Sequence, residues 1–380
     1  MARRRKRLTD LLKVYEPEIQ TAFLASIDEI KSEAVLKDIE AALRRGDIEA
    51  AIGFLYVEPA AYRRFQDARA AAYRAGGDYG VSTMPRDPAG NKLLVRFDGR
   101  AVEAESWLGT RSARRVTNLV EEERSSLRAS LEAAMARGDG PRTMALDIVG
   151  RKDPKTGRRK GGIIGLSAPQ KQAVEAAREE LSSLATMAQF LDRKMRNKNL
   201  DRLINRALKE ERLLTAEEIS TILGAYSDRL LLLRGETIAR TEAMGALHAG
   251  RREAYQQAIN AGKITAEEVY REWDSTGDSK VRHTHRALDG EQVGFDEPYI
   301  SPTGARIMFP GDPDAPASEV INCRCDETYR IDFLARVGGP SQRRPPQLRA
   351  DDVTRLARQS LEGPEIGRVR DRAAPGGGRS

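Results

Sequence analysis

The feature of the sequence that most constrains the fold is a change of pattern at Gly262. Before it, apolar residues recur mainly at steps of three and four, as in Leu12, Tyr15 and Ile19, which is the period of amphipathic helices. After it, the chain breaks into short β-branched or aromatic runs, "EVYREWDST", "EQVGF" and "ARIMF", separated by Gly, Pro and Asp. The sequence therefore predicts an α+β protein, with a mostly α-helical N-terminal and middle region and a small C-terminal module that contains strands.

Punctuating residues divide the first helical region. Gly46 separates two short helices in "EAVLKDIEAALRRGDIEAAIGFL", and Asp47 suits the cap of the second. Pro17 predicts a kink or boundary in the first helix. A further helix, "AAYRRFQDARAAAYRAGGDYG", is expected to end at Gly76 and Gly77.

The middle region shows equally local signals. The run "KLLVRF" within residues 81–100 predicts either a strand or an extended connection. Ser167 in "SAPQ" predicts a capping box, and Thr215 before "AEE" predicts a helix start. A buried helical stripe is expected at Val116, Val120, Leu127 and Leu131.

A chain of 380 residues is longer than one hydrophobic core usually serves. We expect a helical region at 1–80, a helical middle region at 81–235 with a basic loop at 150–162, a module at 236–335, and a mobile Pro/Gly/Arg-rich tail at 336–380. No apolar run approaches the roughly 18–20 residues of a membrane-spanning helix. The basic head of the chain is not followed by the apolar stretch of a signal peptide, so no membrane association is expected.

The basic loop is the sharpest local concentration of charge in a chain of net charge +7. It does not form a phosphate-binding loop of the Walker type, because Lys160 is followed by glycine rather than Ser or Thr. Two interpretations stay open: a solvated linker, or a loop that contacts the DNA backbone. The residues concerned are Arg151, Lys152, Lys155, Arg158, Arg159 and Lys160.

Most of the histidine and all of the cysteine lie close together in the sequence. His283 and His285 are two of three histidines, and Cys323 and Cys325 are the only cysteines. One interpretation is a zinc site built from these four, although the Cys-x-Cys spacing demands a backbone that brings both thiolates to one ion. We expect both thiols to be reduced and do not expect a disulfide framework.

Two other interpretations of this segment remain. His285, Asp278 and Arg282 could perform general acid–base chemistry on a phosphodiester, with the arginine stabilising the developing charge. Alternatively, the polar residues hydrogen-bond the turns of a module that has few strands, and the cysteines are buried as small apolar side chains.

Three segments in order, "IARTEAMGALHAGRREAY", "REWDSTGDSKVRHTHRALDGEQV" and "MFPGDPDAPASEVINCRC", resemble the phage Mu F-like family of minor head (head morphogenesis) proteins. The resemblance is firm over about residues 236–330, and "GRRKGGIIGLSAPQ" extends it upstream. Its signature residues here are Arg240, Thr241, Glu242, Trp273, Asp278, Arg282, His285, Asp289, Gly290, Pro310, Gly311, Asp312, Asn322, Cys323, Arg324 and Cys325.

The resemblance implies a minor capsid protein that acts with the portal protein, and with major capsid or scaffold proteins, during head assembly. It also implies contact with packaged double-stranded DNA and a place in the host bacterial cytoplasm during assembly and in the virion head afterwards. Zinc remains a candidate cofactor, because relatives vary their Cys and His positions as exchangeable metal ligands would; His283 lies outside the family pattern. No enzyme is implied, and a nuclease-like use of His285 is the alternative.

Overall fold

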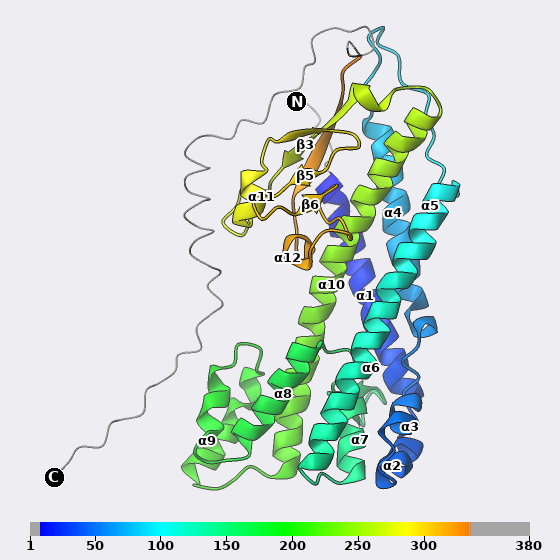
Figure 1. Ribbon diagram of the computed structural model, residues 1–380. Helices are drawn as coiled ribbons and strands as arrows, with labels where there is room; N and C mark the ends of the chain where they lie inside the picture. Colours follow the sequence, from blue (N-terminus) through cyan, green and yellow to red (C-terminus); the bar gives the residue numbers. More distant parts are fainter. Residues whose placement is uncertain (1–7, 334, 336–380) are drawn as a thin grey trace, which may run out of the picture.

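A single helix of 45 residues, α10 (Ala216–Asn260), forms the spine of the computed structural model, which describes residues 8–333 and 335 (Figure 1). It begins at the predicted start, Thr215, with a capping box: the Glu218 amide donates to Thr215 Oγ1, and the Thr215 amide donates to the Glu218 carboxylate. Along its length α10 packs against α1 (Leu8–Glu33) and α4 (Arg63–Thr83), which also pack against each other. The three helices form the long axis of the molecule.

The other elements before the C-terminal module extend this bundle, mostly at the end away from the module (Figure 1). They are α2 (Leu36–Arg44), α3 (Ile48–Gly53), the 3-10 turn η1 (Pro59–Tyr62), α5 (Val102–Ser106), the π-helical turn η2 (Trp107–Arg111), α6 (Ser112–Ala136), α7 (Pro141–Val149), α8 (Ala168–Leu181), the 3-10 turns η3 (Met187–Asp192) and η4 (Lys198–Leu200), and α9 (Asp201–Lys209).

The apolar residues that recur at helical spacing are mostly buried, as predicted. Ile19, Phe23 and Ile27 on α1 are fully buried, and so is the stripe at Val116, Val120, Leu127 and Leu131 on α6. Both belong to one continuous core that extends through the helical bundle. Asp47 caps α3 by accepting from the Ala50 amide, and α8 starts with the predicted capping box at Ser167.

One predicted helix end is wrong, because α4 continues through Gly76 and Gly77 to Thr83. At Pro17, where a kink or a boundary was predicted, the boundary is wrong, because α1 continues to Glu33. The glycines are there for packing, because a Cβ on Gly76 would lie 2.1 Å from the carbonyl oxygen of Leu247 on α10. Glycine at this position lets two helix backbones approach more closely than any side chain would allow.

The predicted basic loop is a short antiparallel hairpin of β1 (Arg151–Lys152) and β2 (Arg159–Lys160). Its base is held between two helices: Lys31 Nζ of α1 donates to the Gly161 carbonyl at 2.7 Å, and the Gly161 amide donates to Asp228 of α10 at 2.8 Å. Gly161 has a φ of +70°, and a Cβ there would lie 2.7 Å from Gly224 Cα. The run "KLLVRF" is an extended connection and not a strand.

The C-terminal module lies against the side of α10 (Figure 1). Its main sheet is antiparallel, with β3 (Val269–Asp274) between β4 (Gln292–Gly294) and β7 (Asp326–Ile331). The remaining elements are the 3-10 turn η5 (Ala266–Glu268), α11 (His283–Ala287), the hairpin of β5 (Tyr299–Ile300) and β6 (Arg306–Ile307), and α12 (Ala317–Val320). The predicted α+β class is confirmed; β7 was not foreseen.

Within the described part of the chain, no helix is long and apolar enough to cross a membrane. The predicted tail at 336–380 lies outside the described residues.

Candidate functional site

The Arg-Thr-Glu triplet of the signature joins α10 to three other helices. Arg240 Nη2 lies 2.8 Å from Glu16 Oε1 on α1. Glu242 forms ion pairs with Arg69 of α4 at 2.9 Å and with Arg115 of α6 at 2.8 Å. Each partner comes from a different helix, so these two signature residues fix the arrangement of the bundle around α10.

The middle residue of the triplet, Thr241, connects α10 to the module. Its Oγ1 accepts from the Asn322 amide at 3.1 Å, directly before the Cys-x-Cys segment. Asn322 has a φ of +59°, a left-handed conformation that asparagine tolerates better than most residues. Gly311 makes a second close contact: a Cβ on it would lie 2.9 Å from the Gly245 amide nitrogen of α10.

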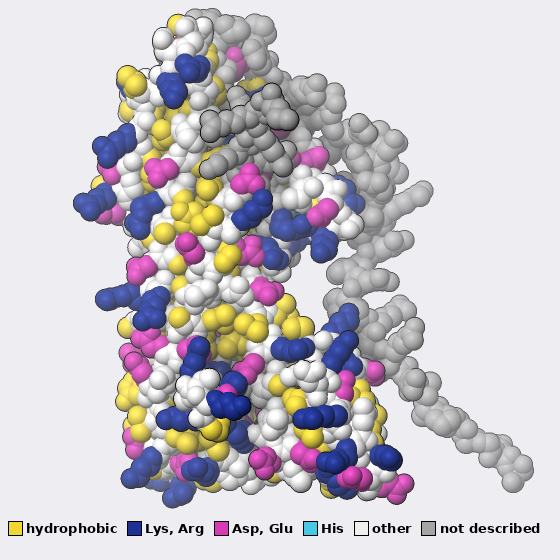
Figure 2. Space-filling model, turned by 180° about the vertical axis from the view of Figure 1, so that it is seen from behind, with side chains coloured by type: hydrophobic (Ala, Val, Ile, Leu, Met, Phe, Trp, Pro, Cys, Tyr) yellow, Lys and Arg dark blue, Asp and Glu magenta, His cyan; other side chains and the backbone are white. Residues whose placement is uncertain are grey.

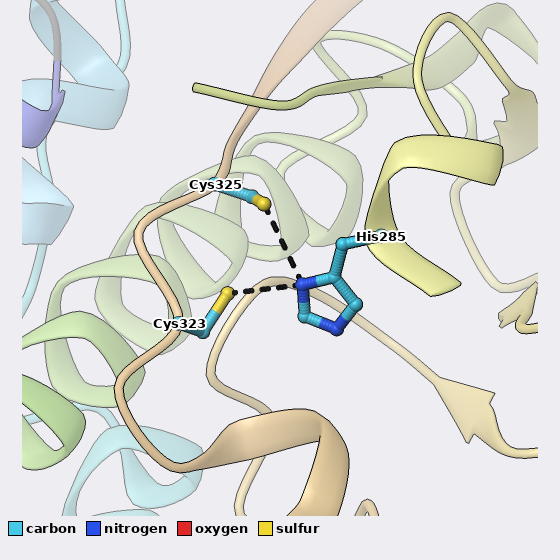
Figure 3. A group of neighbouring side chains, drawn as sticks. All are labelled: His285, Cys323 and Cys325. Atoms are coloured by element: carbon cyan, nitrogen blue, oxygen red, sulfur yellow. Dashed lines mark hydrogen bonds between the residues drawn. The ribbon is translucent and has the colours of Figure 1, made fainter. Parts of the chain in front are cut away.

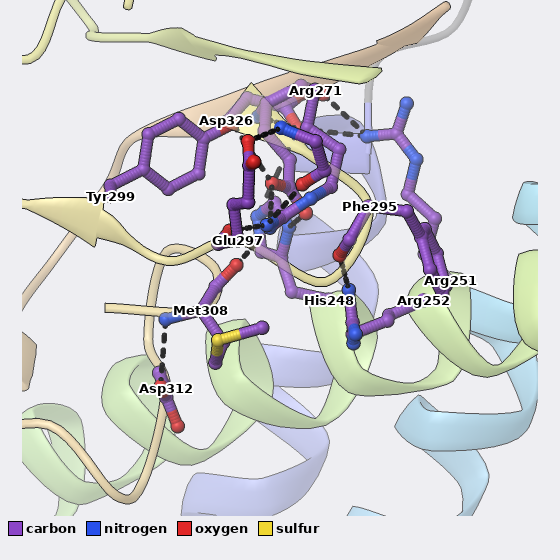
Figure 4. A network of polar contacts seen from close by, with 12 residues as sticks. His248, Arg251, Arg252, Arg271, Phe295, Glu297, Tyr299, Met308, Asp312 and Asp326 are labelled. Atoms are coloured by element: carbon purple, nitrogen blue, oxygen red, sulfur yellow. Dashed lines mark hydrogen bonds and ion pairs between the residues drawn. The ribbon is translucent and has the colours of Figure 1, made fainter. Parts of the chain in front are cut away.

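A buried ionic network fills the space between α10 and the sheet (Figure 4). At its centre, the guanidinium of Arg271 on β3 is fully buried. It donates to the main-chain carbonyls of Gly294, Glu297 and Met308 and pairs with Glu327 of β7 at 3.3 Å. One side chain therefore holds both neighbouring strands and the loop that follows β6.

Helix α10 contributes further charged and polar side chains to the network. Arg251 Nη1 donates to the Glu327 carbonyl at 2.6 Å and to Asp326 at 3.2 Å, and the buried ring of His248 lies 3.7–3.8 Å from both carboxylates. Burial disfavours ionisation of Glu327, but His248, Arg271 and Arg251 outweigh it and bring its pKa to about 2. These residues were not predicted from the sequence. The signal that could have identified them is a charged residue inside an otherwise apolar segment, because a buried charge must be paired.

His285, Cys323 and Cys325 converge in the module core (Figure 3). His285 Nδ1 lies 3.5 Å from each sulfur, and the three side chains are only 1–2% exposed. Both cysteines are free. Their mutual hydrogen bond lowers the pKa of the Cys323 thiol and raises that of Cys325. This group of one nitrogen and two sulfurs could hold a metal ion.

The second ring nitrogen of His285 faces a carboxylate. Nε2 lies 3.1 Å from Glu319 Oε2 on α12. Glu319 also accepts hydrogen bonds from the hydroxyls of Thr284, Ser301 and Thr303, at 2.8, 3.2 and 3.0 Å. Burial opposes ionisation of Glu319, but His285 and the threonine hydroxyls bring its pKa to about 2. No local pattern pointed to Glu319, because its partners lie 16–35 residues away.

Among the described residues, the others predicted for metal binding or acid–base chemistry add no donor atom to this group, although Arg282 lines the hollow beside it. His283 is exposed on α11. Asp278 makes a two-point ion pair with Arg324 at 2.6 and 2.7 Å, which lowers its pKa to about 2. Arg282 donates to two main-chain carbonyls at the end of α12. Asp278 is therefore engaged with Arg324, while Arg282 and His285 contact the carbonyl and the carboxylate of Glu319.

The remaining signature residues shape the module. Trp273 is buried and presents an edge-to-face contact to the His285 ring, with centroids 5.1 Å apart. Asp289 accepts from the Ser275 amide just after β3, and Asp312 accepts from the main-chain amides of Met308 and Asp314 in its own turn. Gly290 has a φ of +77° and donates to the Trp273 carbonyl at 2.9 Å, and Pro310 is buried next to Gly311.

Four of the six cations in the basic hairpin have partners inside the molecule: Arg151 with Asp147, Arg158 with Asp28, Lys160 with Asp153, and Arg159 with the Gly150 carbonyl. For Lys152 and Lys155, residues 8–333 and 335 supply no ion-pair partner. On the face drawn in Figure 2, Lys and Arg alternate with Asp and Glu and form no single basic surface.

Part of the chain matches a known protein family. The family model described as "Phage Mu protein F like protein" matches residues 215–328, which run from the N-cap of α10 into β7. The chain is 30% identical over 175 residues to "Minor head protein GP7" of Bacillus phage SPP1, covering 45% of this chain and 54% of that protein.

Two further relatives match shorter stretches. "Uncharacterized protein YqbB" of Bacillus subtilis is 34% identical over 95 residues, 24% of this chain and 29% of that protein. "NAD(+)--arginine ADP-ribosyltransferase EFV" of Enterococcus faecalis is 30% identical over 122 residues, 31% of this chain and 21% of that protein. The chain thus spans about half, or less, of the length of these relatives. No solved structure matches it significantly.

Proposed function

We propose, from the match of residues 215–328 to the family described as "Phage Mu protein F like protein", that the chain is a minor head protein that acts in phage head morphogenesis. The observation that carries the proposal is the similarity to the SPP1 minor head protein, which covers 45% of this chain. The proposed location is the virion head, reached from the host cytoplasm during assembly.

The contacts of the signature residues support an assembly role. Arg240 and Glu242 fix the helices of the bundle, and Thr241 and Gly311 dock the module on α10. A rigid unit of this kind suits a protein that must present fixed surfaces to neighbours in a shell. We propose the portal protein as its main partner, with major capsid or scaffold proteins as further neighbours.

Contact with packaged double-stranded DNA is a smaller part of the proposal. Within the basic hairpin, Lys152 and Lys155 are the cations whose charge no described residue neutralises. Two free lysines can neutralise only two DNA phosphates. Because the affinity for DNA and its salt dependence scale with the number of phosphates neutralised, such a contact is weak.

A nuclease would need Asp278, Arg282 and His285 to meet around a bound phosphodiester. Asp278 is instead paired with Arg324, and Arg282 is bound to main-chain carbonyls. His285 is buried between two sulfurs and a carboxylate. These contacts favour the assembly role over the enzyme.

The test is genetic and quantitative. A phage with an early stop codon in this gene is grown with and without a plasmid copy, and purified heads are analysed by quantitative mass spectrometry against the portal and major capsid subunits. We expect a few to a few dozen copies per head with the plasmid, and a loss of infectious particles without it. A plasmid copy carrying His285→Ala serves as the comparison for the enzyme.

Two outcomes would overturn the proposal. Heads that form normally, package DNA and infect without the chain would remove the morphogenetic role. Heads that assemble with His285→Ala at normal copy number, but lose a nuclease activity that the parent shows, would establish the enzyme instead.

A further inference from the structure

We propose that His285, Cys323 and Cys325 bind one zinc ion, through the Nδ1 of the imidazole and two thiolates. The inference does not depend on the role in head assembly, because it rests on the donor atoms alone. The residues belong to two segments: His285 lies on α11, and both cysteines lie on the stretch that leads into β7 (Figure 3).

The spacing of the donor atoms fits a tetrahedral ion. With Zn–N near 2.0 Å and Zn–S near 2.3 Å, the nitrogen-to-sulfur edge of a tetrahedron is roughly 3.6 Å. The observed Nδ1-to-sulfur distances are both 3.5 Å, and all three donor atoms lie within 4.8 Å of one another. No large movement is needed to place a zinc ion between them.

The Cys-x-Cys spacing, which had argued against a shared ion, is explained by the local chain. The two cysteines immediately precede β7, and residues two apart on an extended chain face the same side. Both thiols therefore point toward His285, while Arg324 between them pairs with Asp278 in the other direction.

The environment of His285 separates a metal ligand from an ordinary buried histidine. Histidines that bind metals usually present their second nitrogen to a carboxylate, which fixes the tautomer and orients the ring. Glu319 occupies that position at 3.1 Å from Nε2, and three hydroxyl groups orient the carboxylate. A proton on Nε2 leaves one lone pair on Nδ1, which cannot accept well from two thiols at equal distances. A cation in the centre uses all three donors.

Two sulfurs and one imidazole select zinc over magnesium or calcium, which prefer oxygen ligands. Binding releases the thiol protons to solvent, and the two thiolates balance the charge of Zn²⁺. The described residues supply three ligands. The fourth position faces a small hollow lined by Thr276, Lys280, Arg282, Asn322 and Arg324, and we assign it to water. The ion would join α11 to the β7 segment and, through Glu319, to α12.

The experiment uses the full-length chain, expressed in zinc-supplemented medium and purified without chelators. Elemental analysis is expected to give about one zinc per chain for the parent and for His283→Ala, the matched control two residues from the ligand. Cys323→Ser and His285→Ala should lose the metal. Glu319→Gln, which changes a positioning residue, should keep zinc but bind it about 10–100-fold more weakly in chelator competition.

Because a ligand variant can fail to fold, the parent protein is also titrated with a mercurial reagent that blocks thiols. Stoichiometric release of zinc, followed with a metal-sensitive dye, is expected. A parent that holds no zinc and takes up none would show a purely hydrogen-bonded trio and overturn the proposal. Equal loss of zinc in His283→Ala would reveal surface binding and would overturn it as well.

Discussion

Replacing Gly250 with alanine should destabilise this chain, although alanine is the better helix former. Gly250 lies on α10 opposite α4, and a Cβ there would lie 1.9 Å from the Tyr73 carbonyl oxygen and 3.0 Å from the Gly77 amide nitrogen. Both are backbone atoms of another helix and cannot rotate away. Restoring an ordinary contact of 3.4 Å requires the helices to separate locally by about 1.5 Å.

The size of the effect follows from two opposing contributions. A Gly-to-Ala change inside a helix stabilises by about 1 kcal/mol. Overpacking a close contact costs about 1–3 kcal/mol and more when the backbone must move. Because the clash at Gly250 is with backbone, we expect a net loss of about 2 kcal/mol or more. Gly224→Ala, on the same helix, meets its nearest atom at 3.6 Å, so it should be neutral or stabilise by up to about 1 kcal/mol.

The measurement is urea unfolding of the full-length parent and both variants, followed by far-UV circular dichroism. The midpoint should fall for Gly250→Ala and stay level or rise for Gly224→Ala. A Gly250→Ala protein as stable as the Gly224→Ala protein would refute the claim that glycine sets the distance between α4 and α10.

Two further predictions concern buried charge. The folded pKa of Glu327, about 2, lies below its ordinary value of 4.5, so its ionised form stabilises the fold above pH 4.5 and this contribution is lost as the pH falls through 2. The difference in unfolding free energy between parent and Glu327→Gln should therefore shrink from pH 4.5 toward pH 2, and a difference that does not change with pH would contradict this. Lys171→Met should cost about 3–5 kcal/mol in urea unfolding, because it leaves the buried carboxylate of Glu123, 2.9 Å from Lys171 Nζ, without that partner. Adding Glu123→Met should recover part of the loss, and no recovery would contradict the electrostatic account.

Local patterns in the sequence were enough to predict much of the bundle. The stripes on α1 and α6 follow directly from apolar spacing, and the starts of α3, α8 and α10 follow from capping residues at 47, 167 and 215. Gly76 and Gly77 were misjudged because a glycine that ends a helix and a glycine that lets another helix approach look alike until the neighbour is known. Strand β7 was missed because its buried positions include the charged residues Asp326 and Glu327, so no apolar alternation marks it.

The candidate site was predicted in part, for a similar reason. The cysteine and histidine positions are visible in the sequence, but which histidine faces the sulfurs depends on how α11 is placed, and His283 and His285 differ by only two residues. Glu319 and Arg271 could not be identified because their partners are brought to them by the fold. Non-local contacts of this kind leave no periodic trace.

The unbroken course of α10 has a consequence for how the length of the chain controls its geometry. The helix packs against the bundle along its length, and its second half also carries the floor of the module. Each residue of an α-helix advances the chain by about 1.5 Å and turns it by about 100°. Removing a single residue near the middle of α10 would therefore turn its second half, and the module with it, by about a quarter of a turn relative to its first half. The number of residues in α10 therefore determines the direction in which the module faces.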